Sequence, residues 1–261
     1  MVSYFDDGLG HTAQQQAVRD AVGGICAEFD DSYWREHDKA GEYPHEFVDT
    51  LAEEGFLGIL LPEDYGGAGM STAEAVVMME EIAASGGGFA AAQAIHGGVY
   101  NSVPLIKYAE ESLKTDFLPK VAAGEARIQA FGLTEPNAGS DSTAMETRAR
   151  KDGEEYVVDG AKIWISRVEA SDYLLLMART TPRESVDKRT EGISMFLVDL
   201  EDAYDDGLEI ESIPKTASRA VGSYQLWFDG VCIPEENLIG EEGEGFYQML
   251  DGLNEERLVI A

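Results

Sequence analysis

The sequence has little cysteine and little histidine. Its 261 residues include two cysteines and four histidines. Cys26 and Cys232 are far apart and lie in segments with helix and strand patterns, so neither a disulfide framework nor a cysteine-based metal site is predicted. The histidines lack a metal-binding spacing such as H-E-x-x-H, which leaves them surface or packing roles. They are His11, His37, His45 and His96.

Basic residues are also scarce. The chain has 19 lysines and arginines against 50 aspartates and glutamates, a formal net charge of −31 that is spread along the sequence. Such a charge repels nucleic acid and anionic membranes, and it argues against both as partners. A heavily hydrated surface suited to high salt explains the charge better than a specific cationic partner does, so we expect a halophilic source.

Long apolar runs are missing as well. No run approaches the length of about 18 residues that crosses a bilayer, and the opening MVSYFDDGLGH has no basic segment followed by an apolar one. These absences predict a soluble, cytoplasmic protein without membrane insertion. The final LVIA is an apolar run with no glycine, proline or polar residue after it, so we expect a truncated chain.

What the sequence does contain is a folded composition, with 44% hydrophobic and 26% charged residues. Up to about residue 128 the apolar residues follow helical spacing. The loop LPEDYGGAGM interrupts this pattern, Ser71 caps the next helix, and glycines 86–88 separate it from further helical segments. Two helical faces are expected to be buried: the first is Ala17, Ala21, Ile25 and Phe29, and the second, after Pro44, is Phe47, Leu51 and Ala52.

After residue 129 the period changes from helical to alternating. Short runs such as EYVVDGAKIWIS, DYLLLMART and SYQLWFDGVCIP are typical of strands. From residue 244 a helical pattern returns, with inner positions expected at Phe246, Leu250, Leu253 and Leu258. The chain is therefore predicted to be an α+β protein, with an N-terminal all-α domain at residues 1–128, an antiparallel β-barrel or sandwich at 129–237, and the start of a C-terminal helical domain at 238–261.

Three blocks could carry chemistry. FGLTEPNAGS lies at the junction of the helical and strand regions, where cofactor pockets are often built. Its glycines allow close backbone approach, and its hydroxyls can bind phosphate or ring oxygens, although alone it could be a turn. In DGAKIWIS a lone tryptophan in a strand is more often core than cofactor contact. In LNEERLVIA, Asn254 and Arg257 share a helical face, with Glu256 adjacent and Glu255 suited to a solvated charged face.

The first two blocks closely resemble the flavin-binding signature of acyl-CoA dehydrogenases. Other segments, LPEDYGGAGM, EEIA, LPKVAAGEAR and VCIPEENLIGEEGEGF, occur in the family's order, so the resemblance covers essentially the whole chain. It implies FAD as cofactor, with Trp164 against the isoalloxazine and the Ser166 hydroxyl near flavin N5. The implied FAD-binding residues are Phe131, Gly132, Leu133, Thr134, Gly139, Ser140, Trp164, Ile165 and Ser166.

The third block is similar to the L-x-x-E-R helix of isovaleryl-CoA and long-chain acyl-CoA dehydrogenases. In that branch the glutamate before the arginine is the catalytic base, which implies this role for Glu256. Lys188 and Arg189 lie where family members contact coenzyme A, although a solvated basic spot explains them equally well. The implied substrate-binding residues are Ser140, Thr190, Tyr247, Asn254, Glu255 and Arg257.

The family resemblance implies dehydrogenation of an acyl-CoA thioester between Cα and Cβ, with electrons passing to an electron-transferring flavoprotein. In a full-length protein it implies a homodimer or homotetramer, completed by a C-terminal helical bundle. Two alternatives stay open. One is an acyl-CoA oxidase-like flavoenzyme that uses oxygen, and the other is a catalytically incomplete flavin-binding fragment or interaction subunit.

Overall fold

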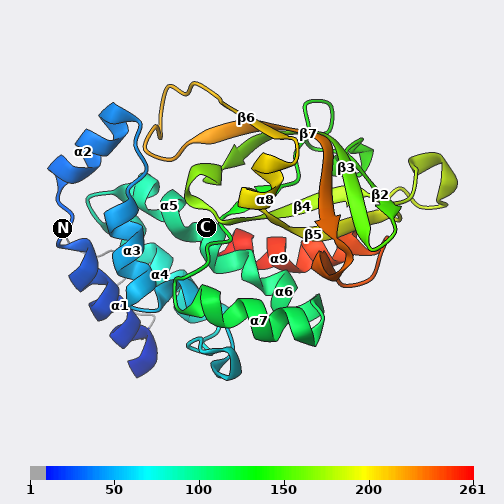
Figure 1. The fold of residues 1–261 in the computed structure, drawn as a ribbon. Coiled ribbons are helices and arrows are strands. Elements are labelled where there is room, and N and C mark those ends of the chain that lie inside the picture. Colours follow the sequence, from blue (N-terminus) through cyan, green and yellow to red (C-terminus); the bar gives the residue numbers. More distant parts are fainter. Residues whose placement is uncertain (1–9) are drawn as a thin grey trace.

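The computed structural model describes residues 10–261, so most of the opening segment that lacks a leader pattern lies outside the described residues. The first half of the chain is helical, and the second half forms a sheet that stands beside and above these helices (Figure 1). The predicted order of helical domain, mainly antiparallel β domain and C-terminal helix is confirmed. The domain boundaries at residues 128 and 237 stay predictions.

The helices before the sheet are short and follow one another closely. Helix α4 begins at a capping box, in which the Ser71 side chain accepts a backbone hydrogen bond and Glu74 binds the Ser71 N–H in return. The helices are α1 (Ala13–Cys26), α2 (Asp31–Ala40), α3 (His45–Glu53), α4 (Thr72–Ala84), α5 (Gly88–Tyr100), α6 (Ser102–Tyr108) and α7 (Glu111–Ala122).

The first predicted helical face is confirmed at Ile25 and Phe29, which are buried, and is wrong at its two alanines. Ala17 and Ala21 are exposed on α1, whereas Val18 and Val22 are buried together with Ile25. Valine removes more apolar area from water than alanine does, so this orientation of the helix is the more stable one. The second predicted face is confirmed, since its members are buried: Phe47, Leu51 and Ala52.

The sheet has the strand order β6-β7-β3-β2-β4-β5-β8, and β1 pairs with β4 outside this path. Most pairings are antiparallel, but β1–β4 and β2–β4 are parallel. A short helix, α8 (Leu200–Asp205), follows β5. The strands are β1 (Ala130–Gly132), β2 (Arg148–Asp152), β3 (Glu155–Ser166), β4 (Tyr173–Arg179), β5 (Ile193–Asp199), β6 (Leu208–Ser212), β7 (Ser223–Pro234) and β8 (Leu238–Ile239).

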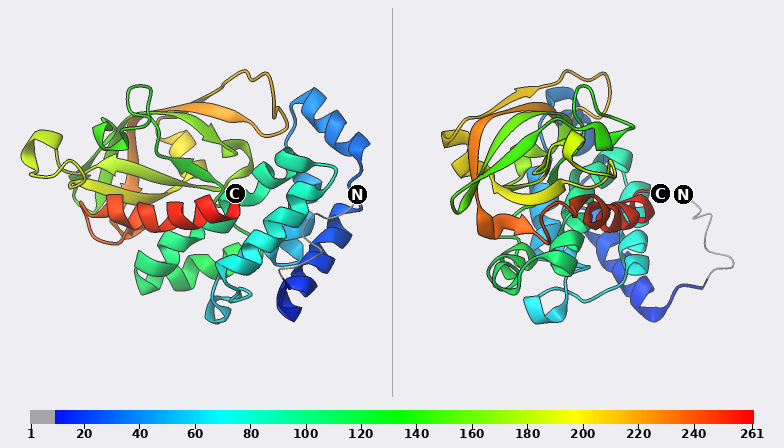
Figure 2. Two further views of the ribbon diagram at one scale, coloured as in Figure 1. Left: turned by 180° about the vertical axis from the view of Figure 1, so that it is seen from behind. Right: turned by 90° about the vertical axis from the view of Figure 1, so that its right-hand side faces the viewer.

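The last helix, α9 (Gly245–Val259), packs against β5 on one side and against α4, α5 and α6 on the other, and it runs below the sheet in the view from behind (Figure 2). Two glycines permit this close packing. A Cβ on Gly245 would lie 2.8 Å from the Ser194 carbonyl carbon in β5, and one on Gly252 would lie 2.8 Å from Pro104 in α6. The expected inner position Leu258 is wrong, because this side chain is 55% exposed. The buried residue is its neighbour Val259.

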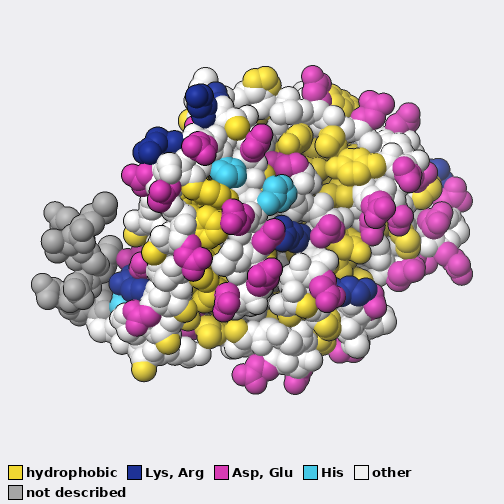
Figure 3. Space-filling model, turned by 60° about the vertical axis from the view of Figure 1, so that its left-hand side comes forward, with side chains coloured by type: hydrophobic (Ala, Val, Ile, Leu, Met, Phe, Trp, Pro, Cys, Tyr) yellow, Lys and Arg dark blue, Asp and Glu magenta, His cyan; other side chains and the backbone are white. Residues whose placement is uncertain are grey.

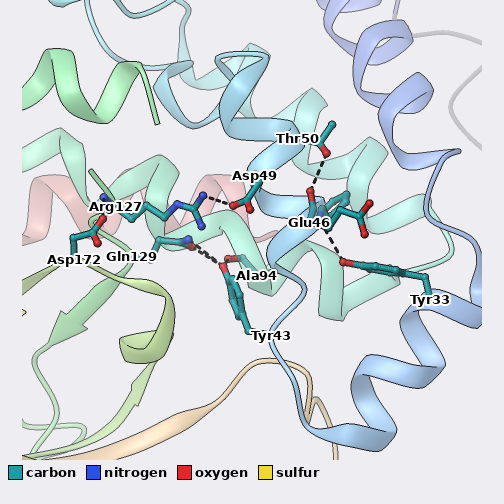
Figure 4. Close-up of polar contacts among 10 residues, drawn as sticks. Tyr33, Tyr43, Glu46, Asp49, Thr50, Ala94, Arg127, Gln129 and Asp172 are labelled. Carbon is teal, nitrogen blue, oxygen red and sulfur yellow. Dashed lines mark hydrogen bonds and ion pairs between the residues drawn. The ribbon is translucent and has the colours of Figure 1, made fainter. Parts of the chain in front are cut away.

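Polar contacts join the helices to the start of the sheet (Figure 4). The Arg127 guanidinium pairs with Asp49 of α3, and the Arg127 N–H donates to Asp172 Oδ2 at 2.7 Å. Two residues on, the Gln129 side chain donates to the Tyr43 hydroxyl oxygen at 3.0 Å. These bonds fix the segment that leads into β1, where the FGLTEPNAGS block begins.

Acidic side chains cover the surface broadly. Figure 3 shows them distributed over one whole face, with only a few lysines and arginines between them. Within residues 10–261, no helix is both long enough and apolar enough to cross a membrane.

Candidate functional site

The FGLTEPNAGS block is a strand followed by an open loop. Phe131 and Gly132 belong to β1, and the chain then leaves the sheet. The Thr134 carbonyl accepts a hydrogen bond from the Ile163 N–H at 2.9 Å, which holds the loop against β3. Gly139 and Ser140 are exposed, and a Cβ on Gly139 would meet nothing within 4 Å. The second half of the loop, around Gly139 and Ser140, is therefore free to contact a ligand.

A buried ion pair anchors this loop, and the sequence analysis missed it. Lys162 of β3 is completely buried, and its Nζ donates to Glu135 Oε1 at 2.7 Å and to the Leu133 carbonyl at 3.2 Å. Glu135 also accepts from the N–H groups of Glu146 at 2.6 Å and Thr147 at 3.0 Å.

These contacts decide the charge of the pair. Burial alone would raise the pKa of Glu135, but Lys162 and the N–H donors hold it below its usual range. Burial lowers the pKa of Lys162 to about 8, so both groups are charged at pH 7. The available signal in the sequence was the alternation along β3, which puts Lys162 on the same side of the strand as the buried Tyr156 and Val158.

The tryptophan of the WIS block points out of the sheet. Pairing between β3 and β7 shifts register between Lys162 and Ile165, and Trp164 in this bulge has φ 63°. Its side chain is 57% exposed, whereas the next residue, Ile165, is buried. Ser166 is half-buried, with its Oγ 3.4 Å from the Ser223 Oγ. An exposed indole on a rigid strand offers a flat apolar surface to a planar partner.

The third block lies on α9. Glu256 is half-buried, and burial raises the pKa of its carboxyl, while the charges of Arg257 and Arg167 oppose this rise. Tyr247, Asn254 and Arg257 are exposed. The interpretation of Glu255 as part of a solvated face is wrong, because its half-buried carboxylate accepts a hydrogen bond from the Thr72 hydroxyl of α4.

Arg167 connects the second block with the third. It follows Ser166 directly, it adopts a left-handed conformation with φ 65°, and it is 4% exposed. Its Nη1 donates to the Gln93 carbonyl of α5, and α5 packs against α9, so the end of β3 and α9 both lie against α5. The structure thus brings Ser166 and Glu256 into one region.

The structure also has an open cavity of about 1000 Å³, which Ser140 and Thr190 themselves do not line. Asp141 and Arg189, neighbours of Ser140 and Thr190, both line it, and their side chains are 3.4 Å apart. Thr190 itself is half-buried. Basic side chains outnumber acidic ones in the lining of this cavity. The four acidic side chains are at positions 141, 146, 184 and 242. The basic lining residues are Arg148, Arg150, Lys151, Arg179, Arg183 and Arg189.

Comparison with known proteins identifies the family. Residues 12–125 match the acyl-CoA dehydrogenase N-terminal domain, and residues 130–231 match the acyl-CoA dehydrogenase middle domain. The chain is 32% identical to mitochondrial isovaleryl-CoA dehydrogenase from Pongo abelii over 98% of its own length and 60% of that protein. It spans about three-fifths of the length of the curated relatives it matches.

Solved structures agree. Butyryl-CoA dehydrogenase from Megasphaera elsdenii superposes with a TM-score of 0.86 at 28% identity, over 96% of this chain and 64% of that one. A glutaryl-CoA dehydrogenase from Mycobacterium smegmatis, solved in complex with FADH2, gives a TM-score of 0.82 at 27% identity, over 95% of this chain and 60% of that one. The fold, the two domain matches and these relatives together establish that the chain belongs to the acyl-CoA dehydrogenase family, whose members are FAD enzymes.

Proposed function

We propose that this chain carries the flavin site, substrate site and catalytic base of an enzyme that oxidises an acyl-CoA thioester to the trans-2-enoyl-CoA, with electrons passing to an electron-transferring flavoprotein. The observation that carries the proposal is the position of Glu256. It is a half-buried carboxylate with a raised pKa, and it lies close enough to Arg167, the residue after Ser166, to feel its charge. A perturbed carboxyl beside a candidate cofactor site is typical of a general base.

The residues present fit FAD. Trp164 is 57% exposed, and the loop around Gly139 has open space beside it. When bound, FAD supplies the acceptor for the hydrogen that leaves Cβ as hydride. Trp164 would lie against the isoalloxazine, and the Ser166 hydroxyl would donate a hydrogen bond to it. The rest of the binding set would be Phe131, Gly132, Leu133, Thr134, Gly139, Ser140 and Ile165.

Glu256 would remove the α-proton. A carboxylate whose pKa is raised by burial is a stronger base once ionised, because the pocket around it solvates the charge poorly. The positive charges of Arg257 and Arg167 oppose this rise and so favour the ionised carboxylate that a base requires. The α-proton of a thioester is weakly acidic, so hydrogen bonds to the thioester carbonyl must stabilise the developing negative charge.

Coenzyme A would lie along polar side chains of the FGLTEPNAGS loop and of α9. The residues proposed to contact the substrate are Ser140, Thr190, Tyr247, Asn254, Glu255 and Arg257. The protein's net charge of −31 opposes a polyanionic ligand, and the basic residues around the cavity at Arg189 offset this repulsion locally. The excess of basic over acidic side chains around this cavity supports its use by a phosphate-bearing substrate.

The test is the substitution Glu256→Gln in the FAD-loaded full-length protein. We expect the variant to keep its yellow flavin but to lose anaerobic bleaching by acyl-CoAs by a factor on the order of a thousand or more. The matched control is Glu244→Gln, because Glu244 is an exposed glutamate at the start of the same helix without a side-chain capping bond. Unchanged bleaching in Glu256→Gln would contradict the assignment of the base.

The electron acceptor is tested separately. Turnover that depends on an added electron-transferring flavoprotein supports the dehydrogenase, whereas oxygen consumption without it indicates the oxidase alternative. A chain that binds no FAD supports the alternative of an incomplete fragment.

Self-association, as a homodimer or homotetramer of the full-length protein, is part of the proposal. Large exposed apolar side chains support it, since such surface commonly marks an interface. One of them is Phe89 of α5, which is 60% exposed. Sedimentation velocity measures the assembly directly.

A further inference from the structure

Four polar side chains gather where α5, α9 and the end of β3 meet. We call them the Arg167 cluster: Arg167 with Gln93, His96 and Tyr100 of α5. Arg167 and His96 are 4% and 7% exposed. Gly97 makes room for the guanidinium, because a Cβ there would lie 2.7 Å from Arg167 Nη2 and 2.4 Å from the Gln129 carbonyl oxygen.

Arg167 is buried without a carboxylate partner. Its Nε donates to the Gln129 carbonyl at 3.1 Å, and its Nη1 donates to the Gln93 carbonyl at 2.9 Å. Within residues 10–261 no carboxylate oxygen lies within 4 Å of the guanidinium, and Nη2 has no hydrogen-bond partner. Buried charges are ordinarily paired, so this guanidinium retains unused capacity to bind an acceptor.

His96 adds a second donor. Its Nδ1 lies 3.2 Å from Arg167 Nη1, and because arginine can only donate, Nδ1 must accept. Burial, reinforced by the charge of Arg167, lowers the pKa of His96 to about 3, so the ring is neutral and its proton resides on Nε2. This Nε2–H has no acceptor among the residues that the structure describes.

Tyr100 adds a third donor one helical turn later. Its ring centroid is 5.5 Å from that of His96, and burial raises the pKa of its hydroxyl to about 12, so the O–H remains protonated. Tyr100 lies on α5, which packs against α9, the helix that carries the candidate base. This hydroxyl also lacks a partner in the described part of the chain. The Gln93 side-chain oxygen is buried and unpaired as well, and its amide can turn to present either atom.

We propose that the Arg167 cluster binds a carboxylate at the end of the substrate's acyl chain, and that Arg167 and Tyr100 determine this specificity. The inference rests on the proposed function, because it places the acyl chain beside Glu256. Three unpaired donors with one positive charge match an acceptor-only anion. A plain aliphatic chain would bury the same donors without partners, and sites built to bond a polar group reject analogues that lack it.

The experiment compares acyl-CoAs of equal chain length with the FAD-loaded full-length enzyme. The pairs are glutaryl-CoA with pentanoyl-CoA, and adipyl-CoA with hexanoyl-CoA. We expect kcat/KM to favour the carboxylated member of at least one pair by about a hundredfold. Tyr100→Phe, which removes a single hydroxyl, should reduce this ratio by about tenfold, and Arg167→Gln should reduce it further. Tyr156→Phe, which removes a buried hydroxyl bonded to Glu242 in the β domain, should not change the ratio.

The outcomes separate the two proposals. A preference for the aliphatic members, or a ratio unchanged in both Tyr100→Phe and Arg167→Gln, overturns the role of the Arg167 cluster but leaves the dehydrogenase intact. If no acyl-CoA bleaches the flavin of the wild-type holoenzyme, the proposed function itself fails. Because Arg167→Gln removes interior hydrogen bonds and could unfold the protein, the milder Tyr100→Phe keeps the test decisive.

Discussion

The buried pair between Lys162 and Glu135 gives a prediction whose size follows from the structure. Lys162→Met keeps the length and apolar stem of the side chain but removes its charge. Glu135 is then left buried, with only the Glu146 and Thr147 N–H groups as donors. Removing one member of a buried ion pair is strongly destabilising, by about 3 to 5 kcal/mol.

Protonation of Glu135 limits this loss. At pH 7 the variant can fold with a neutral Glu135, which costs about 1.36 × (7 − 4.3), or about 3.7 kcal/mol. At pH 5 the same step costs only about 1.36 × (5 − 4.3), or about 1 kcal/mol. In the variant the folded-state pKa of Glu135 is raised above its unfolded value, so its stability relative to wild type recovers as pH falls. We therefore expect a loss of about 3 to 4 kcal/mol at pH 7 that shrinks to about 1 at pH 5.

Urea unfolding of wild type and Lys162→Met at both pH values, followed by tryptophan fluorescence, measures these losses. The double variant Glu135→Gln/Lys162→Met is the matched control, because it removes the stranded charge and should recover most of the stability at pH 7. Equal losses at pH 5 and pH 7, or a loss below about 1 kcal/mol at pH 7, would refute the reasoning. Because Glu135 anchors the FGLTEPNAGS loop, the variant should also release FAD more readily.

The remaining predictions concern the flavin site, a packing contact, the candidate base and the surface. Trp164→Ala should change folding stability by less than about 0.5 kcal/mol, since the side chain is 57% exposed, but should weaken FAD retention several-fold on gel filtration. Gly97→Ala should destabilise by about 1 to 3 kcal/mol in calorimetry, because its Cβ would meet Arg167. At pH values above the usual glutamate pKa, Glu256→Gln should raise the melting temperature, and at lower pH it should have no effect. The reason is that burial raises the pKa of Glu256 in the folded state, so the ionised carboxylate destabilises the fold. The net charge of −31 predicts a melting temperature that rises with KCl, and a salt-independent value would contradict the halophilic expectation.

Local patterns were enough to predict the division into helical and strand regions. The spacing at Phe47, Leu51 and Ala52 and the cap at Ser71 depend on neighbours a few residues away, so they can be read from the chain itself. The same reasoning failed for Leu258 and for the Ala17 face of α1, because the buried side of a short helix depends on which element packs against it.

Short contiguous motifs also supplied most of the residues of the candidate site, whose roles stay predictions. FGLTEPNAGS, WIS and the glutamate of LNEERLVIA are short blocks, and their order along the chain was sufficient to predict the family. They could not predict that Trp164 points outward, because its exposure follows from a bulge with φ 63° in the pairing of β3 with β7. Nor could they predict that Lys162 is paired with Glu135, which lies in a different segment.

The sequence by itself therefore determined the order of secondary structure, the acidic surface and the family, since all of these are encoded in composition and short-range spacing. Only the tertiary structure decided the surroundings of Glu256. His96 and Arg167 are 71 positions apart, yet their side chains touch, and both lie near a helix still further along the chain. Burial and charge at that meeting point depend on segments distant in sequence, and no local pattern contains them.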